Sequence, residues 1–151
     1  MSANLGELEA QRILRARQGD TERAAQQARD ERILSSEQPR FFEAMADSLS
    51  ETVQSFNRTM SLEGEDAVSF SHSGTEIHVG KRGQPTLLRK IMHSERTNEV
   101  CIRTQLIERY RSTVQEEKWY FEVRRGELQL NYKNFVECAD LLFKGIPDTY
   151  R

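Results

Sequence analysis

The hydrophobic periodicity of this chain changes near residue 66, and that change limits the folds open to it. Before this point, large apolar side chains recur with the 3.6-residue period of a helix. After it, they alternate with polar residues at the period of 2 that is typical of strands. A helical first part followed by short strands predicts an α+β fold, in which an antiparallel sheet is covered by helices. A chain of 151 residues is long enough for one such domain.

The strongest helical pattern lies at residues 40–61, where one apolar face extends over about five turns. Its members are Phe42, Met45, Leu49, Val53, Phe56 and Met60. Ser35 and Gln38 have the spacing of a capping box, and Pro39 suits a first helical turn, so we expect this helix to begin here. We interpret the face as core, with a ligand groove or a partner surface as the alternative.

The residues before this helix are far more polar. Residues 1–34 favour helix in composition, because Glu, Gln, Arg and Ala dominate and proline is absent. No large apolar residue lies between Arg15 and Arg32, and Gly19 with its neighbours is a candidate break. We therefore predict a polar N-terminal helix or mobile arm over residues 1–34, followed by a single domain over residues 35–151.

Two interpretations of the arm stay open. Because a helix without an apolar stripe has little to bury, the first is a mobile or solvent-exposed helix. The second is a weak helix–helix contact through the small side chains of Ala24, Ala25 and Ala28.

About six strands joined by short turns are predicted between the helix at 40–61 and a C-terminal helix at 134–145. The clearest strand pair has two facing apolar sets, Trp119, Phe121 and Val123 with Leu128, Leu130 and Tyr132. Residues 86–93 fit strand or a helical turn, and we choose strand. Consecutive strands with short turns pair antiparallel, so the prediction is a meander sheet with both helices on one side. A curled sheet that closes toward a barrel is the main variant.

Charge is distributed unevenly along the chain. The formal net charge is −2, yet residues 1–66 carry 8 basic and 13 acidic side chains, whereas residues 67–151 carry 14 and 11. Neither part has the strong basic excess of a protein held to nucleic acid by phosphate contacts. The acidic part is expected to face solvent or a protein partner.

Several features predict a soluble, cytoplasmic protein. No apolar run approaches the roughly 20 residues that span a bilayer, and residues 1–7 lack the pattern of a secretory signal. Cys101 and Cys138 are interpreted as small buried hydrophobic residues rather than as a disulfide.

No catalytic motif is present, and neither a metal nor a cofactor is expected. His72 and His78 could approach each other across a hairpin, but strand alternation places them on opposite sides. Ser71, His72 and Ser73 beside Glu76 supply the atoms for nucleophilic catalysis without a nucleophile elbow or an oxyanion loop. The sequence favours a non-catalytic protein and leaves enzymatic activity as an open alternative.

The candidate binding residues are basic and aromatic side chains on the predicted solvent face of the later strands. They are Arg103, Arg109, Arg111, Tyr120, Arg124 and Lys133. Arg and Lys around an exposed Tyr are typical of surfaces that bind single-stranded nucleic acid or an acidic partner. Antiparallel sheets also routinely expose one polar face, so an ordinary solvated surface is the competing interpretation.

Three hypotheses about function follow. The first is a non-catalytic protein-interaction or regulatory module that self-associates, because the polar N-terminal helix has no use within a self-contained domain. The second is a small-ligand-binding domain, with an apolar pocket between the sheet and the helix that carries Phe41, Phe42, Met45 and Phe56. The third is weak nucleic-acid binding through the Arg-rich sheet face.

Overall fold

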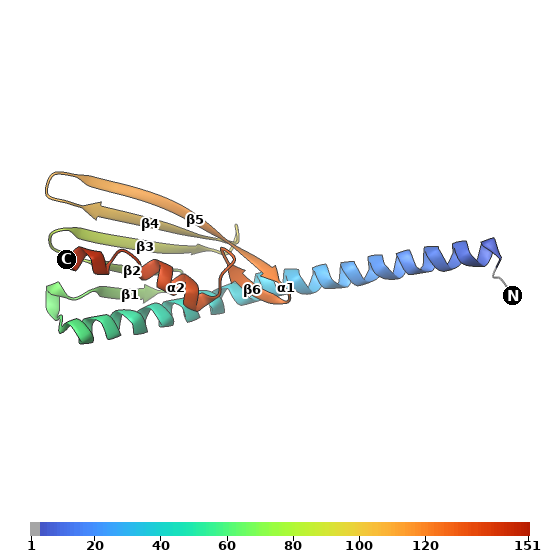
Figure 1. Cartoon of the computed structure of the whole chain (residues 1–151), viewed down its shortest axis with the longest axis horizontal. Coiled ribbons are helices and arrows are strands. Elements are labelled where there is room, and N and C mark those ends of the chain that lie inside the picture. The colour runs from blue at the N-terminus through green and yellow to red at the C-terminus, as the bar shows by residue number, and fades with distance from the viewer. Residues whose placement is uncertain (1–3) are drawn as a thin grey trace.

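The computed structural model describes residues 4–151, in which two α-helices and a single six-stranded sheet form the main elements (Figure 1). The predicted α+β class, with a six-stranded antiparallel meander, a covering helix and a C-terminal helix, is confirmed. In chain order the elements are α1 (Leu5–Met60), η1 (Gly64–Asp66), β1 (Ser69–Ser73), β2 (Glu76–Lys81), β3 (Thr86–Ser94), β4 (Glu99–Ile107), β5 (Ser112–Arg124), β6 (Glu127–Leu130), α2 (Phe135–Phe143) and η2 (Pro147–Tyr150).

Helix α1 is continuous over 56 residues, so the predicted helix start near residue 35 is wrong. The helix is capped at Asn4, whose Oδ1 accepts a hydrogen bond from the amide of Glu7 at 2.9 Å. Ser35 and Gln38 lie inside the helix rather than at its start. The Ser35 hydroxyl donates to the carbonyl of Arg32 at 3.2 Å, and the Gln38 side chain is buried.

The helix continues through Pro39 and does not break at Gly19. Proline lacks the N–H group and removes one helical hydrogen bond. Extending a helix from an anchored segment nevertheless costs far less than starting a new one. Burial anchors the segment that begins at Phe41, and the helix-favouring residues before Pro39 extend it toward the N-terminus. Residues 1–3 of the predicted arm lie outside the described residues.

The six strands form one sheet in the order β1-β2-β3-β4-β5-β6, with every pair antiparallel. Residues 86–93, which fitted either a strand or a helical turn in the sequence and were predicted as strand, lie in β3, and β3 pairs with both β2 and β4. The sheet curls into a half-barrel (Figure 1), and no pairing joins β1 to β6 among residues 4–151, so the sheet stays open.

One hydrophobic core fills the inner face of the sheet, which faces α1 and α2. The α1 side of this core is Phe41, Phe42, Met45, Ala46, Leu49 and Val53. Trp119, Phe121 and Leu130 are buried with them, as the hairpin pattern predicted. Phe56 is only partly buried, and Met60 is exposed at the end of the predicted stripe.

A buried polar network fixes α1 to the β3–β4 hairpin. Gln38 is 2% exposed, and its Oε1 lies 2.9 Å from Nε2 of His93 on β3. The Gln38 Nε2 donates to Oδ1 of Asn98 in the turn before β4 at 2.7 Å. Both ends of the amide therefore have partners, as a buried polar group requires. Burial lowers the pKa of His93, and the charge of Glu95 opposes that shift.

Helix α2 ends the core, close to the predicted range of 134–145. Asn134 and Glu137 form a capping box: the Asn134 Oδ1 accepts from the amide of Glu137 at 2.9 Å, and the Glu137 carboxylate accepts from the amide of Asn134. Gly145 follows the helix with a φ of 89°, which lets the chain turn so that Ile146 packs into the core.

Candidate functional site

The N-terminal half of α1 extends away from the sheet as a bare helix (Figure 1). Every residue from Asn4 to Arg29 except Gly19 is exposed. Ile33 and Leu34 are half-buried, and Leu34 packs against the core. We call residues 5–29 the projecting segment; at 1.5 Å per residue it is roughly 40 Å long.

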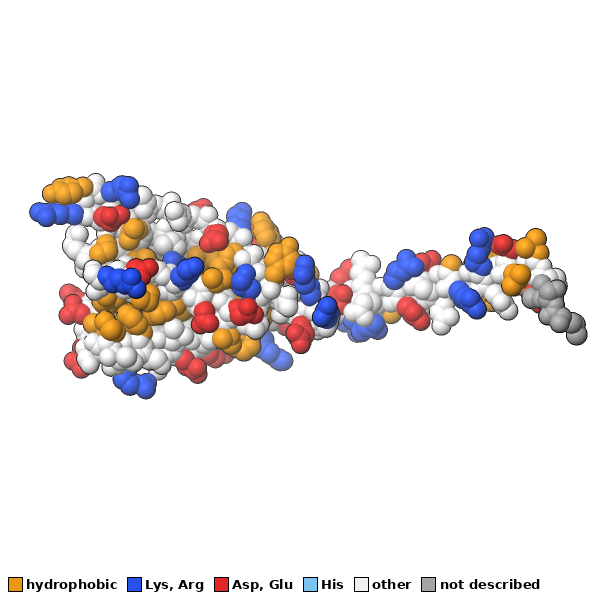
Figure 2. Space-filling view, in the orientation of Figure 1, with side chains coloured by type: hydrophobic (Ala, Val, Ile, Leu, Met, Phe, Trp, Pro, Cys, Tyr) orange, Lys and Arg blue, Asp and Glu red, His pale blue; other side chains and the backbone are white. Residues whose placement is uncertain are grey.

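The projecting segment carries the most exposed leucines of the chain. Leu5 is 74%, Leu8 51% and Leu14 61% exposed, and Ile13 is also exposed. Figure 2 shows hydrophobic side chains, interspersed with charged ones, toward the N-terminal end of the projecting helix. Single exposed apolar residues are ordinary on protein surfaces, so their position alone does not define a site.

Local polar pairs support the projecting segment. Glu9 and Arg12 form an ion pair at 2.9 Å, and Gln26 Nε2 donates to Asp30 Oδ1 at 2.8 Å. Pairs three or four residues apart on a helix contribute about 0.2–0.5 kcal/mol each, and these are exposed to solvent. They favour helix without providing the tertiary packing that normally stabilises a polar helix in water.

One face of the projecting segment is formed largely by small residues. Its members follow one another at alternating spacings of four and three residues, the repeat of helices that pack side by side. They are Ala10, Leu14, Arg17, Thr21, Ala24 and Ala28, which we call the seam. The same alternation leads on to Gln38, Phe42, Met45 and Leu49, the side of α1 that is buried in the core. The seam thus extends the core-facing side of the helix into solvent.

The six binding residues predicted from sequence lie in three places: the outer face of β4 and β5, the loop between these strands, and the region where β5 and β6 end. Arg103 lies on the outer face in β4, and Tyr120 in β5 faces the same side. Arg109 and Arg111 lie in the loop before β5, whereas Arg124 ends β5. Lys133 follows β6 and is half-buried. Because β5 has 13 residues, its two ends are about 40 Å apart.

Carboxylates lie beside most of these cations. Glu116 pairs with Arg103 at 4.0 Å, and Glu108 pairs with Arg111 at 3.4 Å. Arg124 lies 3.3 Å from a carboxylate oxygen of Glu122 and also over the ring of Tyr132. The outer face therefore alternates in charge, in contrast to the continuous positive surface that suits phosphate contacts.

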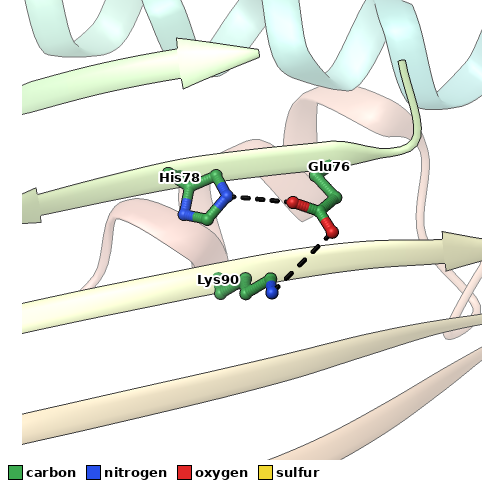
Figure 3. Close-up of polar contacts among 3 residues, drawn as sticks. All are labelled: Glu76, His78 and Lys90. Atoms are coloured by element: carbon green, nitrogen blue, oxygen red, sulfur yellow. Dashed lines mark hydrogen bonds and ion pairs between the residues drawn. The ribbon is translucent and has the colours of Figure 1, made fainter. Parts of the chain in front are cut away.

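A hollow of about 660 Å³ on the outer face brings Arg103 together with two cations that the sequence pattern did not group, Arg82 and Lys90. Next to it, Glu76 lies between His78 and Lys90 (Figure 3): His78 Nε2 is 3.2 Å from one carboxylate oxygen, and Lys90 Nζ is 3.7 Å from the other. The hydrogen bond to His78 and the charge of Lys90 lower the pKa of Glu76. The strand register explains why His78 and Lys90 lie beside the same glutamate, because they are direct partners on β2 and β3.

The serine, histidine and glutamate side chains that the sequence grouped near residues 71–76 have other partners in the structure. Glu76 contacts His78, while His72 faces the inner side beside Phe42, so the two histidines point to opposite sides as predicted. Ser71 is the cross-strand partner of His78, but no hydrogen bond joins them in the part of the chain that the structure describes. Glu76, His78 and Lys90 thus form an exposed polar cluster across β2 and β3.

Both cysteines are free, in accord with the prediction of no disulfide. Cys138 is fully buried on α2, and its thiol donates to the carbonyl of Leu130 at 3.3 Å. Burial raises the pKa of Cys138 to about 12, so its reactive thiolate form is suppressed. Cys101 is half-buried on β4.

Comparison with known proteins gives no relative: no protein-family model, curated protein or solved structure matches this chain. Over residues 4–151, no helix is both long and apolar enough to cross a membrane. Nor does any group of three or more His, Cys, Asp and Glu side chains among those residues have the arrangement of a metal site.

Proposed function

We propose that this protein is a non-catalytic interaction module that self-associates through the seam of its projecting segment. The observation that carries the proposal is a helix of 56 residues in which residues 5–29, apart from Gly19, are exposed to solvent. In proteins most of the stability of a helix comes from the packing of one of its faces rather than from helix propensity. A second copy of the same helix supplies such packing.

An antiparallel pair suits the seam better than a parallel one. If two copies cross antiparallel about the middle of the seam, Ala10 faces Ala28, Leu14 faces Ala24, and Arg17 faces Thr21. Leu14 and Arg17 then lie opposite the smaller side chains of Ala24 and Thr21. In a parallel pair each residue would face its own copy, and Arg17 would meet Arg17, which is destabilising for like charges. Antiparallel pairing also places the two sheets at opposite ends of the pair.

Sedimentation equilibrium of the full chain tests the proposal. We expect a dimer at micromolar concentration, with moderate affinity because the seam has few large apolar side chains. Ala24→Glu inserts a charge into the seam and should weaken dimerisation at least tenfold. Ala16→Glu is the matched control, since it makes the same substitution at an exposed position of the same helix outside the seam and should leave the dimer unchanged.

Two results would oppose the proposal. A wild-type protein that stays monomeric at high micromolar concentration would remove self-association. Equal weakening by Ala16→Glu and Ala24→Glu would show that any association uses another surface. Circular dichroism of both variants serves to confirm that they keep the wild-type helix content, because Glu and Ala are both good helix formers.

A further inference from the structure

The inner face of the sheet is not uniformly apolar. Arg89 on β3, Thr104 on β4 and Gln115 on β5 are register partners and form a polar row across three strands. In the neighbouring row, Ile102 on β4 is the partner of Glu117 on β5. Arg89 and Glu117 are therefore charged side chains on the face of the sheet that holds the core.

A cleft of about 510 Å³ opens over these rows, between β4, β5 and α2. Its floor is Ile102 and Trp119, which are 3% and 4% exposed, and Leu141 of α2 is half-buried at its wall. The volume lies within the range of about 300–1,000 Å³ that small-molecule sites occupy. In contrast, the side chains of Phe42 and Met45, where the sequence placed an apolar pocket, are packed in the core.

Arg89 is a half-buried cation whose hydrogen-bond partners are all neutral. Its Nε donates to Thr104 Oγ1 at 2.9 Å, and its Nη1 donates to the carbonyls of Leu142 and Lys144. These bonds tie α2 to the sheet and leave Nη2 without a partner among residues 4–151. Burial lowers the pKa of Arg89, and the negative charge of Glu117 opposes that shift.

Glu117 is the complementary group on the other side of the cleft. Its side chain is exposed, and it forms neither an ion pair nor a hydrogen bond within the described residues. The carboxylate is close enough to act on the charge of Arg89, yet the two groups do not form an ion pair. The cleft thus presents a cation and an anion, separated by an apolar floor.

We propose that this cleft binds a small zwitterion of the α-amino-acid class with an apolar side chain. The ligand carboxylate accepts hydrogen bonds from Arg89 Nη2 and from the hydroxyl of Thr104, and its ammonium group donates to Glu117. The apolar side chain lies on Ile102 and Trp119. Charge-assisted hydrogen bonds of this kind are stronger than neutral ones, and each ligand charge meets an opposite one. The site does not depend on self-association.

Isothermal titration calorimetry of the full chain with three probes tests the ligand class. L-leucine carries both charges, 4-methylpentanoate lacks the ammonium group, and 3-methylbutylamine lacks the carboxylate. We expect L-leucine to bind about tenfold or more tightly than either analogue, since each loses one charge-assisted contact. The absence of L-leucine binding up to millimolar concentration, or equal binding of all three probes, would overturn the proposal.

Two glutamates on β5 provide a matched pair of variants. Glu117→Gln should weaken L-leucine about tenfold and leave 4-methylpentanoate unweakened, because only L-leucine presents an ammonium group. Glu122→Gln is the control: its side chain pairs with Arg124 and it does not line the cleft, so L-leucine affinity should not change. Identical affinities in the two variants would refute the assignment of Glu117. This test does not require substitution of Arg89, which also holds α2.

Discussion

The two halves of α1 are covalently one helix but differ in what they contact. From Phe41 to Val53 the helix buries an apolar stripe against the sheet, and Met45 and Leu49 are completely inaccessible to solvent. Over the projecting segment, residues 5–29, the same side of the helix carries small residues and faces solvent. Helix length and helix burial therefore have separate causes. Helix propensity and cooperative extension from an existing helix determine how long α1 is, whereas apolar side chains determine which part of it is buried.

The sharpest test of this comparison substitutes the same residue type in both halves. Leu49→Ala should lower the free energy of unfolding by about 3–5 kcal/mol, because the site is fully buried and a cavity remains. Leu8→Ala, on the exposed half and outside the seam, should change it by less than about 0.5 kcal/mol. Urea titration of both variants measures the difference. Similar losses would show that the projecting segment packs on the fold.

A smaller effect should come from the polar network where the buried half begins. Because burial lowers the pKa of His93, the unfolded chain binds a proton at higher pH than the folded chain does. The free energy of unfolding should therefore fall as pH decreases below about 6.5, by up to about 1.4 kcal/mol per pH unit.

Substitution of His93 tests the origin of this pH dependence. His93→Gln should reduce the fall between pH 7 and pH 5.5, since Gln does not titrate there and can still donate to Gln38. Denaturant titration of the wild type and the variant at the two pH values measures the difference. A wild-type slope in His93→Gln would assign the pH dependence to another group.

The smallest effect is expected from removal of most of the projecting segment. Deletion of residues 1–22 removes only exposed side chains among the described residues and leaves Leu34 in contact with the core. At a protein concentration low enough to avoid association, the free energy of unfolding should change by less than about 0.5 kcal/mol. Urea unfolding that loses its single cooperative transition would show that the segment is part of the folding unit.

Patterns of neighbouring residues were sufficient to predict most of the domain. The stripe of Phe42, Met45 and Leu49 and the facing hairpin residues Trp119 and Phe121 are buried together, because apolar periodicity reflects which side of an element leaves water. The start of the covering helix could not be predicted in the same way. Helix signals near residue 35 are local, whereas the continuity of α1 depends on a core anchor that lies further along the chain.

The candidate sites were less predictable than the fold. Alternation correctly placed Arg103 and Tyr120 on the outer face, but it carried no information on loops or on the distance along β5. The cleft at α2 was not predicted from the sequence. Arg89 and Glu117 are 28 positions apart, and only the register of β3, β4 and β5 brings them to the same cleft.

By itself, the sequence determined the fold class, the order of the elements and most of the core, because these follow from the period and position of apolar side chains. The tertiary structure alone decided that α1 is one helix and that its first half projects into solvent. It also decided that Gln38 is a buried link to His93 and Asn98 rather than a helix cap. Such features depend on contacts between residues far apart in the chain, and local periodicity cannot predict those contacts.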